Sequence, residues 1–373
     1  MAEFDIDDVR AGVAAGVIDE VQATKLIAIA NGRQGHRINM GAEDEPFELF
    51  KGFSEIFVTV GLGILFTGIL SISAAFGNVV AVMAFAIILS AAFAFYFTLR
   101  RRMTLPSIAL SLVYAGSVAV LATYLILGPA IEEYESSGNI PDAVNALIVA
   151  SICAVAMLVY FWKFRVPFAM FLFGLFCGGI AFSIAGIIAP ESIFAAGFMT
   201  YMGTADGFFD LSRNPTMAWT MLLFGFGAFL GGMYFDLKDP YRISRYSSCG
   251  FWLHIIAAPA IVNVVALSLL SIDGVLGYVY AALALTIIAV VALVIDRRSF
   301  LTAGIFYIGV ILMWALNSAD SGGDDGNIII AMLIMGGFIT ALGTWWVQLR
   351  ASLMKLLPNF PLKSKLPPYR EAL

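Results

Sequence analysis

Two polar side chains interrupt the long apolar run SSCGFWLHIIAAPAIVNVV, residues 247–265, and could handle a proton or an ion. The imidazole of His254 has an ordinary pKa of about 6.5, so it can gain or lose a proton near neutral pH. Pro259 removes a backbone hydrogen bond and can kink a helix, which frees carbonyl groups that could coordinate an ion. With Asn263, half a helical turn away from His254, these residues form a candidate pathway. The alternative is a neutral imidazole that is hydrogen-bonded to a neighbouring helix.

Glu55 begins another apolar run and is the nearest approach in this chain to an intramembrane carboxylate. A buried acid in a membrane helix is costly, so it is by default a candidate for proton or cation handling. Lys51 lies four residues earlier, where the two side chains can pair on one helix face. We therefore expect an interfacial Lys51–Glu55 pair and keep Glu55 as a further candidate pathway residue.

A turn that carries both signs of charge comes just before the His254 run. Asp236, Asp239, Arg242 and Arg245 lie close together in FDLKDPYRISRYSSCGFW. Charges at this spacing could form an ion-paired structure or bind an anionic lipid headgroup. Basic residues collect in the cytoplasmic turns of membrane proteins in any case, so we expect a solvated, self-paired turn.

The connection 190–216 holds the candidate exterior mouth of a pathway. Its second part, DGFFDLSRNP, contains Asp206, Asp210 and Arg213, which as a lid would present two acids and one cation to a solute. Loops of this size often only cover helix ends. The apolar first part, IFAAGFMTYMG, favours a segment that lies along the membrane surface.

Metal or nucleophile chemistry has no recognisable motif in this sequence. The chain has no HExxH motif and no Cys/His cluster, and His36 is the only histidine besides His254. Cys153, Cys177 and Cys249 lie in apolar runs or next to them, as small hydrophobic residues do. We expect no metal, no other cofactor and no nucleic-acid partner.

These side chains must be positioned by helices that cross a membrane. Hydrophobic residues make up 61% of the chain and charged residues 13%, which excludes an ordinary soluble protein. Ten apolar runs are each long enough to span a hydrocarbon core about 30 Å thick. They are 56–76, 78–98, 104–127, 142–162, 166–189, 217–235, 247–270, 275–295, 299–317 and 327–349. The sequence predicts an all-α, polytopic protein with about ten transmembrane helices in a lipid bilayer.

The basic residues predict the orientation. Once the runs are taken as crossings, 20 of the 21 Lys and Arg residues fall on one side, and Arg213 alone falls on the other. Cytoplasmic loops retain basic residues, so both termini are expected in the cytoplasm. The first 50 residues are polar and acid-rich, which is not typical of a cleavable signal peptide.

Three regions follow from this division. Residues 1–46 predict a small helical hairpin, separated near Gly16, and a linker, a module that could dock on a protein partner. Residues 47–350 begin with an amphipathic interfacial segment and hold the membrane spans. Residues 351–373 form a basic, proline-containing tail that is expected in the cytoplasm.

Small and aromatic residues predict how the spans pack and where they end. Gly174 with Gly178, and Gly227 with Gly231, form GxxxG pairs that let two helix backbones approach. Aromatic residues at the expected cytoplasmic ends of spans predict a belt at the membrane surface. They are Tyr160, Trp162, Trp345 and Trp346.

Two stretches resemble uncharacterised membrane proteins. AGVIDEVQATKLIAI, which precedes the polytopic domain, resembles the short helical module at the head of a bacterial membrane-protein family of unknown function. FDLKDPYRISRYSSCGFWLHIIAAPAIV looks like a segment of uncharacterised polytopic inner-membrane proteins of bacteria. The resemblance implies a bacterial inner-membrane location and brings no activity with it.

Three function classes fit these patterns. A transporter of a small solute or ion explains the spans and the proline near His254, and it predicts a water-accessible cavity that reaches mid-membrane. A noncatalytic scaffold or sensor that signals through the N-terminal module predicts a cavity-free bundle with a cytoplasmic docking surface. A membrane-embedded enzyme that acts on lipid would have to use the region from Asp236 to His254. The sequence favours the transporter, and an enzyme is the least favoured of the three.

Overall fold

The computed structural model describes most of the membrane region of the chain. It covers residues 53–128, 143–189, 209–239, 242, 245–318, 323–359, 361 and 363–367, with Val9, Gly12, Ala15, Val17, Ile18 and Leu26. The N-terminal module and linker lie almost wholly outside the described residues. Every regular element within the described ranges is helical.

Ten long α-helices match the ten predicted spans. They are α3 (Phe53–Phe76), α4 (Val79–Ala94), α5 (Thr104–Ile126), α7 (Ala143–Phe164), α8 (Phe168–Ile188), α11 (Pro215–Lys238), α12 (Arg245–Leu270), α13 (Val275–Ile295), α14 (Ser299–Ser318) and α15 (Gly323–Leu356). A six-residue π-helix, η1 (Phe95–Arg100), continues α4. Among the described residues, nine helices are long and apolar enough to cross a membrane, and α14 has a shorter apolar stretch, Ser299–Trp314. The chain is therefore a multi-pass integral membrane protein.

Polar residues mark where helices begin. Asn78 accepts a hydrogen bond from the backbone N–H of Ala81 at 3.1 Å and starts α4. Asn214 does the same for α11, with Pro215 at the first helical position, where its missing N–H is not needed. Gly77, with a φ of 69°, allows the chain to turn between α3 and α4.

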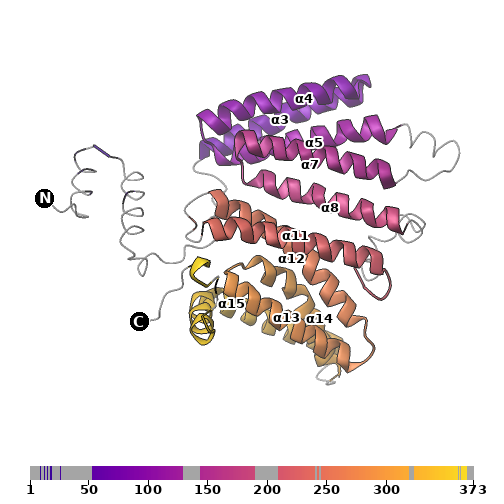
Figure 1. The fold of residues 1–373 in the computed structure, drawn as a ribbon, viewed down its shortest axis with the longest axis vertical. Coiled ribbons are helices and arrows are strands. Elements are labelled where there is room, and N and C mark those ends of the chain that lie inside the picture. The colour runs from indigo at the N-terminus through magenta and orange to yellow at the C-terminus, as the bar shows by residue number, and fades with distance from the viewer. Residues whose placement is uncertain are drawn as a thin grey trace.

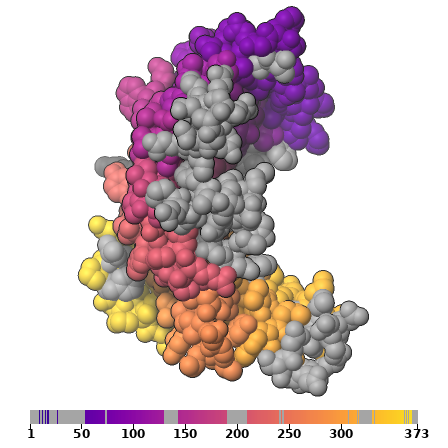
Figure 2. Space-filling view, turned by 90° about the vertical axis from the view of Figure 1, so that its right-hand side faces the viewer, coloured from indigo at the N-terminus to yellow at the C-terminus, as the bar shows by residue number. Residues whose placement is uncertain are grey.

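The long helices lie side by side in one row, from α3 and α4 at one end to α13, α14 and α15 at the other (Figure 1). Two groups of five helices make up the row, and α8 joins them because it contacts both α11 and α12. The row curves: its indigo and orange ends project to the same side in Figure 2.

The outer faces of the helices are apolar. Large side chains such as Phe57, Ile88, Val155 and Leu283 are exposed, as expected of residues that face lipid. Helix α12 differs from the other candidate spans. In its apolar stretch 50% of the residues are buried inside the protein, against 6 to 33% in the others. The helix that carries His254 is therefore the most enclosed of the nine candidate spans in the described part of the chain.

The structure confirms one GxxxG pair and half of the other, because a Cβ atom at Gly231 would lie 3.4 Å from Cδ1 of Leu253. A Cβ atom at Gly174 would lie 2.5 Å from Cδ1 of Ile256, and one at Gly178 would lie 3.3 Å from the ring of Phe224, so both positions are closely packed. A Cβ atom at Gly227 would meet nothing within 4 Å, so this glycine makes no close helix contact among the described residues.

The aromatic belt is also only partly confirmed. Trp162 and Trp345 are 79% and 56% exposed, which fits residues at a membrane surface. Tyr160 and Trp346 are buried inside the bundle, and for them the prediction is wrong. Tyr160 packs against Phe164, at a ring-centroid distance of 4.6 Å.

Candidate functional site: a buried charge cluster

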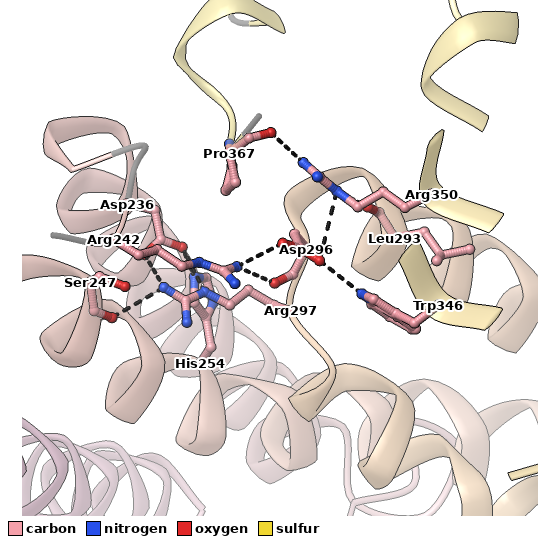
Figure 3. Close-up of polar contacts among 10 residues, drawn as sticks. All are labelled: Asp236, Arg242, Ser247, His254, Leu293, Asp296, Arg297, Trp346, Arg350 and Pro367. Carbon is pink, nitrogen blue, oxygen red and sulfur yellow. Dashed lines mark hydrogen bonds and ion pairs between the residues drawn. The ribbon is translucent and has the colours of Figure 1, made fainter. Parts of the chain in front are cut away.

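Asp236 is the centre of a group of buried charged side chains near the end of α11. Its carboxylate accepts hydrogen bonds from Nε of Arg297, at 3.0 Å, and from Nη2 of the same guanidinium (Figure 3). The other partner is Nε2 of His254 on α12, at 2.9 Å. Because an ionised carboxylate only accepts hydrogen bonds, we assign the proton of the imidazole to Nε2.

Two glycines make room for this contact. A Cβ atom at Gly232, one turn before Asp236, would lie 2.7 Å from Cε1 of His254. A Cβ atom at Gly250, one turn before His254, would overlap the carboxylate of Asp236. Helices α11 and α12 thus pack through two glycines, each of which faces the polar side chain of the opposite helix.

Asp296, at the end of α13, is a second buried carboxylate. Trp346 of α15 donates to it through Nε1 at 2.8 Å. Nη2 of Arg242 lies 3.2 Å from its Oδ2 and also donates to its backbone carbonyl at 2.5 Å. Nε of Arg350 lies 3.7 Å from its Oδ1. Figure 3 shows these groups converging on Asp296 from separate segments of the chain.

The turn between α13 and α14 places opposite charges on adjacent residues. Asp296 has a φ of 59° and a ψ of 48°, a left-handed conformation that aspartate adopts more readily than most residues. Arg297 follows it, is 1% exposed, and donates to the backbone carbonyl of Ser247 at 3.1 Å as well as to Asp236. We call Asp236, Arg242, His254, Asp296, Arg297 and Arg350 the charge cluster.

The charge cluster also holds the C-terminal segment. Arg350 donates to the carbonyl of Leu293 at 3.1 Å and to that of Pro367 at 2.6 Å. Lys363, in the 3-10 helix η3 (Lys363–Lys365), donates at 2.8 Å to the carbonyl of Met354 in the last turn of α15 and to that of Leu357 directly after the helix. The segment after α15 therefore folds back onto the same end of the bundle.

His254 is fully enclosed at the centre of this arrangement. Its ring packs between Phe229 of α11 and Phe300 of α14, at centroid distances of 5.5 and 5.8 Å. Its Nδ1 makes no hydrogen bond with any described residue. The charge cluster holds the guanidinium groups of Arg242 and Arg297 close to this imidazole. A proton on Nδ1 would bury a further positive charge beside the guanidinium that shares Asp236 with it.

The turn before α12 is buried, so the prediction of a solvated turn is wrong. Asp236 and Asp239 are 5% and 8% exposed, and the side chain of Arg242 is 8% exposed. Asp236 and Arg242 pair with the α13–α14 turn, 54 to 61 positions further along the chain. Arg245 is exposed, and no hydrogen bond or ion pair links it to the charge cluster.

Asn263 and Pro259 lie away from the charge cluster. Tyr307 of α14 donates to Oδ1 of Asn263 at 2.9 Å, whereas His254 bonds to α11. Pro259 is exposed, and α12 remains helical through it. The two polar side chains have different neighbours, as their spacing predicts, and their role in a pathway stays a prediction.

Glu55 belongs to the first turn of α3 and lies against the start of α5. Its carboxylate accepts hydrogen bonds from the backbone N–H groups of Thr104 and Leu105, both at 3.1 Å. These groups belong to the first turn of α5, which has no hydrogen-bonding cap residue of its own. Unpaired N–H groups and the helix dipole both favour a carboxylate there. The expected partner, Lys51, lies outside the described residues.

Asp210 closes the end of the bundle opposite the charge cluster. It is fully buried and accepts hydrogen bonds from the N–H and Oγ of Ser212 at 2.8 Å and from Oγ of Ser271 at 2.6 Å. Nε of Arg213 lies 3.5 Å away. Burial raises the pKa of Asp210, but these hydrogen bonds and the charge of Arg213 outweigh it, so the pKa lies below its ordinary value. Asp206 lies outside the described residues, and the exterior mouth stays a prediction.

The sequence analysis did not predict that four residues belong to this site: Asp296, Arg297, Trp346 and Arg350. A basic residue in a turn satisfies the positive-inside bias whether it is solvated or buried, so Arg297 carries no separate signal. Two patterns could have found the site. One is an acid placed directly before the basic pair of a short turn, and the other is a glycine one turn before each of Asp236 and His254.

Within the described residues, no group of three or more His, Cys, Asp and Glu side chains is arranged to hold a metal ion. No family model, no curated protein and no solved structure matches the chain.

Proposed function

We propose that this integral membrane protein moves a small solute or an ion in a proton-dependent way, with the charge cluster as its cytoplasmic gate. The observation that carries the proposal is the imidazole of His254, fully buried, bonded to Asp236 through Nε2 and without a hydrogen bond at Nδ1. Ionisable groups inside membrane helices are expensive and commonly serve ion or proton movement.

Nδ1 of His254 is the proton acceptor of this gate. Around the imidazole lie Asp236 from α11, Arg297 from the α13–α14 turn, and the Arg242–Asp296 pair beyond them. A proton on Nδ1 adds repulsion toward the guanidinium groups of Arg297 and Arg242. Separating α11 and α12 from the α13–α14 turn relieves that repulsion. Because the open gate binds one more proton than the closed gate, opening is favoured as the pH falls.

A lipid-acting enzyme has less support. A hydrolase built on Asp236 and His254 needs a nucleophile beside the second imidazole nitrogen. No serine, threonine or cysteine of the described chain bonds to Nδ1, and the imidazole has no exposed surface through which a lipid could reach it.

Proton flux into liposomes tests the proposal. The full chain is reconstituted with an internal pH dye, a pH step is applied, and proton entry is recorded alone and with a panel of amino acids, sugars, organic acids and monovalent and divalent cations. His254→Gln keeps an amide donor for Asp236 but cannot take a proton, so it is expected to abolish the solute-dependent flux. His36→Gln, at the only other histidine, is the matched control. Equal flux in wild type and His254→Gln would contradict the proposal.

A second candidate, a pH sensor, is favoured by the contact between Arg350 and Pro367. If the charge cluster rearranges on protonation, the C-terminal segment loses this anchor and becomes available to a partner. The test is a single cysteine at the buried Leu366, in a chain whose three native cysteines are replaced by alanine. Faster maleimide labelling at low pH, without solute-dependent flux, identifies a sensor. Lys365→Cys, exposed in the closed state, is the control and should label equally at both pH values.

A further inference from the structure

A second concentration of positive charge lies where the two groups of helices meet. A cleft of about 470 Å³ is lined by Thr98 and Leu99 of η1, by Arg102 in the turn after it, by the segment Trp162–Arg165 between α7 and α8, and by Arg245 of α12. Four of its lining side chains are cationic: Arg102, Lys163, Arg165 and Arg245. We call this region the basic cleft.

Among the described residues, no acidic side chain lines the basic cleft. All four cationic residues are exposed, and none of them makes an ion pair with another described residue. Glu55, in the first turn of α3, does not line the cleft. Its carboxylate is already bonded to the backbone N–H groups of Thr104 and Leu105. Four unmatched cations around one cavity repel one another, and an anion in the cavity removes that repulsion.

Close packing between α8 and α12 fixes the walls of the basic cleft. Trp252 packs against Phe168 and Phe171 at centroid distances of 4.8 and 5.3 Å. Gly174 lets Ile256 approach the backbone of α8. These contacts lie within about three helical turns of Arg165, in the turn before α8, and of Arg245, the first residue of α12, so they fix the backbones that carry both cations.

Two backbone features of the walls also favour an anion. Arg245 lies in the first turn of α12, where the helix dipole disfavours a cation unless a negative group is present. Thr98 and Leu99 belong to the π-helix η1, a widened form of helix that is frequent at functional sites and is rare elsewhere.

We propose that the basic cleft binds a phosphate-bearing anion, the headgroup of an acidic membrane lipid. Arginine matches phosphate oxygens with two parallel N–H donors, and three of the four cations are arginine. The lining residues occupy the ends of three candidate spans and the turns after two of them, which is the depth of lipid headgroups. A headgroup bound here bridges the α7–α8 turn and α12, and so fastens the two five-helix groups together.

The test compares two quadruple variants of the full chain in detergent. In the cleft variant, Arg102, Lys163, Arg165 and Arg245 become glutamine. The matched control removes four exposed positive charges that do not line the cleft, through Arg100→Gln, Arg101→Gln, Lys355→Gln and Lys365→Gln. Bound lipid is counted by native mass spectrometry, and the rise in the midpoint of thermal unfolding is measured with phosphatidylglycerol, phosphatidylcholine and inorganic phosphate.

The wild type and the control variant are expected to retain phosphatidylglycerol and to gain thermal stability from it, more than from phosphatidylcholine. Loss of four charge-assisted contacts should weaken this binding by about tenfold or more in the cleft variant. Equal stabilisation by inorganic phosphate alone would assign the site to a soluble phosphate instead of a lipid. Equal loss in both variants, or no response of the wild type to any phosphate compound, would overturn the proposal. Neither result depends on whether the protein transports a solute.

Discussion

The charge cluster and the basic cleft lie at the same end of the bundle, and both are rich in cationic side chains. The surroundings of these side chains differ. In the cluster, the guanidinium groups of Arg242, Arg297 and Arg350 are buried and bonded to carboxylates and carbonyl groups. In the cleft, all four cationic residues are exposed, and no acid of the described part of the chain lines it. A count of basic residues, from which the orientation is predicted, cannot distinguish these two environments.

The two regions differ in the source of the negative charge that balances their cations. The cluster finds its counter-charges within the chain, so its stability depends on those partners remaining in place. The described residues supply no counter-charge to the cleft, and in our proposal an external anion supplies it. We therefore expect single substitutions to disturb folding in the cluster and ligand binding in the cleft.

The largest effect is expected from Asp236→Asn. It leaves the buried guanidinium of Arg297 without its carboxylate, which typically lowers the free energy of unfolding by about 3 to 5 kcal/mol. Arg165→Gln in the basic cleft should change it by less than about 0.5 kcal/mol. Both are measured by denaturant titration in mixed micelles without added lipid. The double variant Asp236→Leu/Arg297→Met should recover much of the loss, and similar losses for Asp236→Asn and Arg165→Gln would erase the distinction.

A smaller effect is expected from Gly232→Ala. The added methyl group would lie 2.7 Å from the His254 ring, so α11 and α12 must separate and the stability should fall by about 1 to 3 kcal/mol. Gly227→Ala on the same helix, where a Cβ atom meets nothing within 4 Å, should be neutral or slightly stabilising. The thermal midpoints of the two variants in detergent make the comparison. A destabilised Gly227→Ala would restore the GxxxG prediction for that helix.

Glu55→Ala tests a carboxylate that meets N–H groups instead of arginine. Its loss removes the cap of α5 and should lower the stability by about 1 kcal/mol, well below the effect of Asp236→Asn. Glu55→Gln keeps an acceptor oxygen and should lose less. If Glu55 served ion movement, both variants would remove flux in liposomes while changing the thermal midpoint little.

The smallest effect should be that of Asp210→Asn, and it should depend on pH. The pKa of Asp210 lies below its ordinary value in the folded protein, so the ionised carboxylate contributes stability at pH values above that ordinary value. This contribution is lost as the pH falls through the folded-state pKa. At neutral pH the variant should be destabilised by less than about 1 kcal/mol. The two thermal midpoints should converge in acid, and a constant difference would assign the effect to packing.

The hydrophobic pattern predicted all ten long helices, because a membrane span is encoded locally in its length and polarity. The run 275–295 is the helix α13 to the residue. The last helix is longer than predicted, since α15 continues to Leu356 through RASLMKL. Arg350 and Met354 in that stretch are buried against the folded-back tail, so tertiary contacts extend the helix beyond its apolar part.

The candidate site was only half predictable. His254 and the Asp236–Arg242 turn were singled out by residue type, but their pairing with the α13–α14 turn joins residues more than 50 positions apart. Periodicity carries no information on such contacts. The aromatic belt failed at Trp346 for the same reason, because only the fold reveals that its indole meets Asp296.

The partners of Asp296 also bear on biosynthesis. Trp346 is fifty residues further along the chain, and the carbonyl of Pro367, which Arg350 holds, is later still. The ribosome must therefore finish α15 and most of the tail before this carboxylate acquires its complete set of neighbours. Glu55 and its partners in α5, by contrast, emerge within the first third of translation. A chain truncated after α14 would leave the insertion machinery with an unfinished second group of helices, which a membrane protease could recognise.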